Sequence, residues 1–194
     1  MSEQPRYALA VSTLEPRKNY PNLIRAWERV VDRHDPALRL VIVANPGWRE
    51  EAILRERAPH VRAGGILHLQ DVPRDELAAL AREAACFAHP SFGEGFGYPP
   101  LEALAAGTPA VVSDIPVFRW LLGEAALFVD PYDVEAIADG IARLVDPGEA
   151  GTVLRASLRA RAPAVLGRYA MDAVAGRWAA LLDGLRTRPI ASRV

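Results

Sequence analysis

Short apolar runs alternate along this chain with longer amphipathic segments. The apolar runs predict strands at 7–11, 38–44, 66–69, 85–89, 110–113 and 126–129. The amphipathic segments predict helices at 21–34, 48–57, 74–83, 99–106 and 134–145. Regular alternation of strands and helices is typical of a parallel sheet with helices on both faces. The pattern therefore predicts a doubly wound, Rossmann-like α/β fold.

The strand pattern stops near Pro147, and only helical segments follow. Two helices are expected, at 149–161 and 170–185, with breaks at Pro163 and Gly167. Gly107 is well placed to end the helix that precedes it. We therefore expect one domain over 1–194, with an α/β core at about 6–147 and a C-terminal helical extension at about 149–187.

Composition narrows the class of protein. The chain has 194 residues, of which 51% are hydrophobic, and this excludes disorder as the default. A net charge of -1 argues against a nucleic-acid partner. The single cysteine, Cys86, excludes a disulfide framework and is expected to be a buried apolar residue. The first residues show no secretory signal and no apolar run approaches the length of a membrane span, so we expect a cytoplasmic protein.

The first candidate binding loop, at 12–19, follows the first predicted strand. Ligands of open parallel sheets bind beyond the carboxyl ends of the strands. Arg17 and Lys18 lie next to each other in this loop, and Lys18 is the only lysine among 23 cationic side chains. A guanidinium beside an ammonium suits a phosphate or diphosphate. The alternative is a solvated basic turn.

The second candidate loop, at 90–102, follows the fourth predicted strand. Its three glycines allow the backbone to approach a ligand closely, and two prolines then suit the first turn of a helix. Glu94 lies in the loop and Glu102 about one turn into the helix, so we expect both to face the crevice. A carboxylate in this apolar stretch needs a partner, and vicinal sugar hydroxyls are suitable donors. His89, at the strand end, is interpreted as structural.

The stretch PSFGEGFGYPPLEALAAGTPAVVSD resembles the signature of the family 4 retaining glycosyltransferases, which have the GT-B fold. The motif of that family is two glutamates separated by seven residues, as Glu94 and Glu102 are here. VSTLEPRKNYPNLIRAW resembles the phosphate-contacting loop and helix of the family, and RYAMDAVAGRWAALL resembles its terminal helix. The resemblance implies that the chain is the C-terminal, donor-binding half of a GT-B fold, and that the N-terminal acceptor domain is absent from this sequence.

The resemblance also implies roles for individual residues. Glu94 is expected to bind hydroxyls of the donor hexose, and Glu102 to bind the ribose hydroxyls. Arg17 and Lys18 are expected to neutralise the diphosphate leaving group, so these two cations and Glu94 are the candidate catalytic residues. Thr13 stands where many members carry arginine. The residues expected at the nucleotide sugar are Thr13, Arg17, Lys18, Glu94, Gly95, Phe96, Gly97, Tyr98 and Glu102.

As a function, the resemblance implies transfer of a hexose to a glycan or lipid-linked acceptor in polysaccharide biosynthesis. We favour mannose from GDP-mannose, with UDP- and ADP-sugars left open, and expect no metal or other cofactor. A sugar-nucleotide epimerase of the same architecture and a non-catalytic nucleotide-sugar-binding module are the alternatives. Without an acceptor domain, the chain alone is expected to bind donor but not to transfer the sugar. Peripheral membrane association of the full-length enzyme stays open.

The resemblance carries one expectation about packing. The terminal helix of the family crosses back to the other domain. Part of its apolar face is therefore expected to be uncovered here, at Met171, Val174, Trp178 and Leu181.

Overall fold

The computed structural model describes residues 6–186, and within them six parallel strands form one sheet in the order β3-β2-β1-β4-β5-β6. The strands are β1 (Tyr7–Val11), β2 (Arg39–Val43), β3 (Ile66–Leu69), β4 (Cys86–His89), β5 (Ala110–Ser113) and β6 (Leu127–Val129). Each lies within one residue of the predicted range at either end. This strand order is that of a doubly wound Rossmann-like sheet, so the predicted fold class is confirmed.

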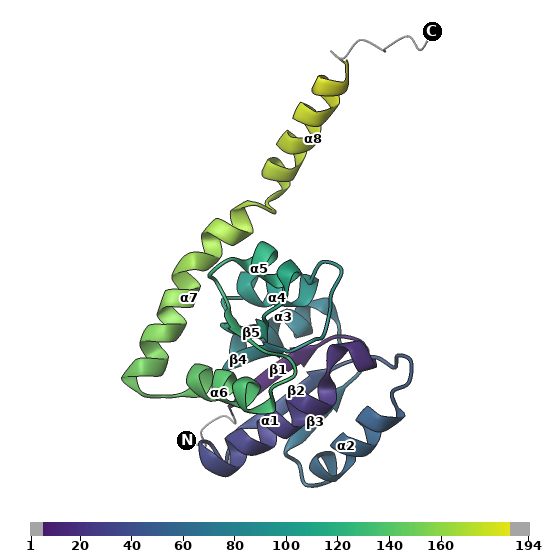
Figure 1. The fold of residues 1–194 in the computed structure, drawn as a ribbon, viewed down its shortest axis with the longest axis vertical. Helices are drawn as coiled ribbons and strands as arrows, with labels where there is room; N and C mark the ends of the chain where they lie inside the picture. The colour runs from purple at the N-terminus through teal and green to yellow at the C-terminus, as the bar shows by residue number, and fades with distance from the viewer. Residues whose placement is uncertain (1–5, 187–194) are drawn as a thin grey trace.

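Helices cover both faces of the sheet (Figure 1). They are α1 (Tyr20–Arg33), α2 (Glu51–Arg62), α3 (Arg74–Glu83), α4 (Tyr98–Ala105), α5 (Pro116–Leu122), α6 (Val134–Val145), α7 (Glu149–Gly167) and α8 (Met171–Arg186), with a short 3-10 helix, η1 (Pro16–Lys18). α1, α2 and α6 pack on one face, while α3, α4 and α5 pack on the other.

Alternate residues of the central strands enter the two cores. Ala8 and Ala10 of β1 pack in the core under α1 and α6, whereas Leu9 packs in the core under α4 and α5. Burial on both faces explains why these strands read as continuous apolar runs. Cys86 is fully buried, as expected, and burial raises the pKa of its thiol to about 12.

Three helices differ from the sequence-based prediction by more than a shift of one residue. α2 spans Glu51–Arg62 rather than 48–57. It begins later than predicted because Gly47 packs directly against the Leu14 backbone and Arg49 has a left-handed conformation. α5 was not expected from the pattern, although Pro116 is a suitable first residue for it. The predicted break at Pro163 is wrong, since α7 continues through it to Gly167.

Tertiary packing explains why α7 continues through Pro163. A proline inside a helix removes one backbone hydrogen bond, and buried apolar contacts offset that loss in α7. Leu158, Ala162 and Val165 of this helix are all buried. The predicted C-terminal glycine of α4 is confirmed, because Gly107 follows the helix with a positive φ of 81°.

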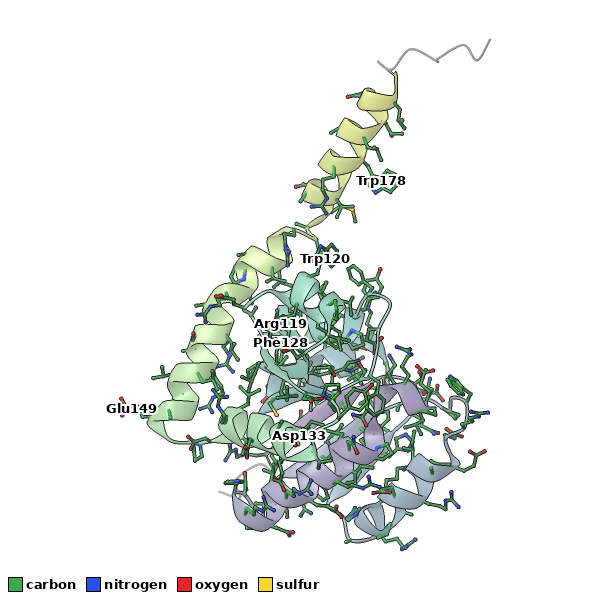
Figure 2. The ribbon with its side chains drawn as sticks, viewed as in Figure 1. Arg119, Trp120, Phe128, Asp133, Glu149 and Trp178 are labelled. Atoms are coloured by element: carbon green, nitrogen blue, oxygen red, sulfur yellow. The ribbon has the colours of Figure 1, made fainter. Side chains whose placement is uncertain are left out.

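α7 runs along the side of the domain, whereas α8 projects away from it (Figure 1). Met171, Trp178 and Leu181 are 80%, 61% and 54% exposed, as the sequence led us to expect. Val174, which was expected to be uncovered with them, is half-buried. Figure 2 shows Trp178 on this helix, far from the sheet. The predicted end of the extension, at about 187, lies outside the described residues, as do the two ends of the predicted 1–194 domain.

Candidate active site

The candidate site lies where the strand order of the sheet reverses. β1 is central, with β2 on one side and β4 on the other, so the chain winds outward in both directions from this point. The loops that follow β1 and β4 therefore leave the same edge of the sheet side by side and diverge. Such a switch point is where open α/β sheets bind their ligands.

Asn19 links these loops through hydrogen bonds. Its backbone has a left-handed φ of 60°, and its side chain is buried. The side-chain nitrogen donates to the carbonyl of Pro90 at 2.8 Å and to that of Pro131 at 2.7 Å. The backbone N–H of Phe92 donates to the carbonyl of Arg17 at 2.8 Å. These bonds hold the loop after β1 against the loop after β4.

Glu94 is the centre of the resulting cluster of charges. Its Oε1 atom lies 2.7 Å from Nζ of Lys18 and 2.9 Å from Nε2 of His89, and its Oε2 atom lies 2.8 Å from Nη1 of Arg17. The carboxylate is only 7% exposed. Burial by itself raises the pKa of Glu94, but donation from His89, Lys18 and Arg17 outweighs burial and holds that pKa well below its ordinary value.

Both cations pair with Glu94, and Arg17 has a second carboxylate partner. Arg17 also pairs with Glu15 at 2.5 Å and donates to the carbonyl of Gly93 at 2.5 Å, while its side chain stays 42% exposed. Burial lowers the pKa of Arg17, but its bonds to Glu94 and Glu15 outweigh burial and raise it. Lys18 is more enclosed, with 10% of its side chain exposed. An incoming diphosphate can replace these carboxylates as the partner of both cations.

The glycine-rich loop enters α4 through Gly97, which has a φ of 97°. The Phe96 ring lies 4.7 Å from that of Tyr98, centroid to centroid, and 5.6 Å from that of Tyr169, which lies between α7 and α8. Trp120, labelled in Figure 2, completes this aromatic group at 6.3 Å from Phe96. Gly95 has open space where a side chain would be.

Two predicted residues lie apart from the charge cluster. Glu102 is 55% exposed and faces the groove between α3 and α4, with Nη2 of Arg74 at 4.0 Å. Thr13 lines a hollow of about 350 Å³ at the carboxyl ends of β1 and β2, beside Asn45 and Asp71. The structure thus brings Arg17, Lys18 and Glu94 into contact, whereas Thr13 and Glu102 line separate hollows outside this cluster. Their roles stay predictions.

The sequence interpretation missed Asn19 and did not foresee that His89 contacts Glu94. Asn19 follows the two cations directly, and asparagine is common in left-handed turns, so its position carried a usable signal. His89 was interpreted as structural. Its alternation with Phe87 along β4 places both on one face, and the turn that follows β4 brings Glu94 back over the His89 ring.

Replacing Gly97 by alanine is expected to lower the free energy of unfolding by about 2–4 kcal/mol. The positive φ disfavours a side chain, and the new Cβ atom would lie 2.6 Å from Cε1 of the buried Phe118 ring. Gly95→Ala is the matched control, since no atom lies within 4 Å of its Cβ position. Urea unfolding measures both variants. Equal stability of the two would show that the entry to α4 is not constrained as described.

The lowered pKa of Glu94 predicts a loss of stability in acid. The unfolded chain binds a proton on this carboxylate near pH 4.5, whereas the folded chain binds it only at much lower pH. The free energy of unfolding therefore falls below pH 4.5, with a slope from this group of up to about 1.4 kcal/mol per pH unit. Glu94→Gln is expected to remove that slope in urea titrations between pH 4.5 and 2.5. Glu56→Gln, which removes a carboxylate that pairs with Arg25, is the control.

The described residues contain neither a helix suited to span a membrane nor a cluster of potential metal ligands. Between residues 6 and 186, no helix is long and apolar enough to cross a membrane. In the same described range, His, Cys, Asp and Glu side chains form no group of three or more that could hold a metal ion.

The fold and the site together define the class: a Rossmann-like domain with a cation pair and a carboxylate at its switch point, as in one half of a GT-B fold. Among solved structures, the chain is similar to an alpha,alpha-trehalose-phosphate synthase (UDP-forming) from Burkholderia vietnamiensis. The TM-score is 0.76 with 20% identity, covering 92% of this chain and 45% of that one.

The family is shown by sequence. The family model described as "Glycosyl transferases group 1" matches residues 1–162, and the chain belongs to this family. It is 36% identical over 132 residues to the O-antigen chain mannosyltransferase B of Escherichia coli. It is 32% identical over 151 residues to the O-antigen chain mannosyltransferase RfbU of Salmonella typhimurium. These matches cover 68% and 73% of this chain but only 35% and 42% of the two relatives.

Proposed function

We propose that this chain is the donor-binding domain of a retaining glycosyltransferase, which moves a hexose from a nucleotide sugar to a glycan or lipid-linked acceptor. The observation that carries the proposal is the contact of Arg17, Lys18 and Glu94 at the switch point of the sheet, in a chain of the group 1 family. The activity requires a second domain for the acceptor, and this chain spans less than half of the two relatives described above.

Mannose is the hexose that the comparisons support. Both relatives are named as mannosyltransferases, and these names favour transfer over the epimerase alternative. The trehalose-phosphate synthase is named as UDP-forming, but at 20% identity it is informative about the fold alone. We therefore propose GDP-mannose as the donor, with the guanine base resting on the family resemblance.

The chain's own residues supply the chemistry of the leaving group. As the bond between sugar and phosphate breaks, negative charge grows on the diphosphate, and Arg17 and Lys18 stabilise that charge without a metal ion. Glu94, released from one or both cations, accepts hydrogen bonds from hydroxyls of the hexose. The hollow beside Thr13 and the groove beside Glu102 leave room for the nucleoside.

Nucleotide binding by the isolated chain tests the proposal. GDP, UDP, ADP and their sugars are compared by thermal shift and by titration calorimetry, with and without EDTA. A ligand at about 100 times its Kd is expected to add about 2.7 kcal/mol of stability, or roughly 5–10 °C in the unfolding midpoint. The GDP ligands are expected to bind most tightly, and EDTA is expected to change nothing. Absence of a shift with all six ligands would contradict the proposal.

Variants of the two glutamates are expected to distinguish binding of the hexose from binding of the nucleotide. Glu94→Ala should weaken binding of the nucleotide sugar relative to that of the free nucleotide, because within the ligand the carboxylate binds only the hexose. Glu102→Ala should weaken the binding of both ligands equally, because Glu102 is expected to bind the ribose that they share. Each lost hydrogen bond to a charged group corresponds to about a tenfold rise in Kd or more. Glu56→Ala is the matched surface control. Identical behaviour of the Glu94 and Glu102 variants would show the two roles to be wrong.

A further inference from the structure

His89 is buried beneath Glu94 and held on two sides by aromatic rings. It is 4% exposed. Its ring stacks on that of Phe87 with 5.9 Å between centroids, and it meets the edge of Phe118 at 5.8 Å. Its Nε2 atom lies 2.9 Å from Oε1 of Glu94. The imidazole therefore has a fixed orientation, and that orientation points to one atom of one carboxylate.

The hydrogen bond defines the protonation state of the ring. An ionised carboxylate can only accept, so Nε2 of His89 carries the proton. Burial lowers the pKa of His89, and the nearby charges of Lys18 and Arg17 lower it further, against the opposing effect of Glu94. The ring is thus a neutral donor at neutral pH.

Among the three donors to Glu94, His89 differs from the other two. Arg17 and Lys18 are the groups that a diphosphate would engage, so ligand binding draws them away from the carboxylate. His89 lies buried at the end of β4, between Phe87 and Phe118, and is expected to stay in place. His89 keeps its hydrogen bond to Oε1 of Glu94, while Oε2 becomes free to accept a hydrogen bond from a sugar hydroxyl.

We propose that His89 is a positioning residue, which holds Glu94 ready for the donor sugar after the two cations turn to the diphosphate. This inference rests on the proposed function. His89 does not touch the ligand, so its contribution is specific to the hexose and depends on Glu94. A histidine that only fills the core would change folding stability and affect GDP and GDP-mannose alike.

Calorimetry of the chain with GDP and GDP-mannose measures this contribution, with UDP and UDP-glucose as a second pair. His89→Leu fills the space but cannot donate, and it is expected to reduce the preference for the nucleotide sugar over the nucleotide by about tenfold. His89→Gln can place an amide donor near the position of Nε2 and is expected to restore most of that preference. His60→Leu is the matched control, because Nε2 of His60 pairs with Glu28 at 2.8 Å, away from the site.

A double-mutant cycle with Glu94→Ala shows whether His89 acts through the carboxylate. In that background, His89→Leu is expected to change the preference no further. Additive losses, or a preference that survives His89→Leu in the otherwise unchanged chain, would overturn the inference and leave the proposed function intact. If the unmodified chain binds neither pair, the proposed function itself fails and this inference fails with it.

Nitrogen NMR of the ligand-free chain gives a second readout that requires no variant to bind. The His89 signals, assigned by their absence in His89→Gln, are expected to show a neutral ring protonated at Nε2 near pH 7. A ring protonated at Nδ1 alone would overturn the inference, as it could not donate to Glu94.

Discussion

Replacing Lys18 by alanine in a full-length enzyme that carries this domain is expected to lower kcat by about 10²–10³, while donor Kd rises much less. Nζ of Lys18 is nearly enclosed and lies 2.7 Å from Glu94. Its charge matters most where negative charge is growing, which is on the departing diphosphate. Single-turnover transfer at saturating donor separates the two effects.

Controls for Lys18 are available within the same chain. Lys18→Arg keeps the charge and is expected to retain a larger fraction of kcat than alanine does. Arg25→Ala removes an exposed cation that pairs with Glu56 on another surface, and it should have no effect on transfer. Arg17→Ala is expected to act like Lys18→Ala if Arg17 stands in for the arginine that many family members carry at the Thr13 position. A Lys18→Ala enzyme with unchanged kcat would contradict the role of the ammonium in leaving-group departure.

Replacing Asn19 by alanine is expected to have the largest effect on stability, a loss of about 3–5 kcal/mol in the free energy of unfolding. The change leaves the buried carbonyls of Pro90 and Pro131 without this donor, and it puts alanine at a φ of 60°. Urea unfolding measures the loss. Nucleotide binding should weaken as well, because the loop that carries Arg17 and Lys18 is no longer held against the loop that carries Glu94.

Two further variants separate the causes of this loss. Asn19→Gly tolerates the left-handed backbone and is expected to be less destabilising than alanine, by about 1 kcal/mol. Asn22→Ala removes a weaker donor to the same Pro131 carbonyl, at 3.2 Å, and should cost less than 1 kcal/mol. If Asn19→Ala were as stable as Asn22→Ala, the side chain of Asn19 would not be the link between the loops.

The helices and strands of this chain follow closely from local patterns. The ranges of α3 and α6 and of three strands match the sequence prediction residue for residue, because apolar periodicity and turn residues agree there. The prediction failed where packing overrides a local signal. α7 continues through Pro163 because its apolar residues are buried against the domain, and the start of α2 is delayed because Gly47 packs on Leu14.

The sequence by itself determined the candidate residues for the chemistry: Arg17 and Lys18 after one strand, and the spaced glutamates after another. Which of them meet was decided by the tertiary structure, since strand order follows from how the helices pack on the sheet and not from any local pattern. β1 and β4 are neighbours, so Glu94 meets Lys18 across 76 positions of sequence, whereas Glu102 faces a separate groove. The same packing places His89 under Glu94, because only the turn after β4 folds the carboxylate back over the ring.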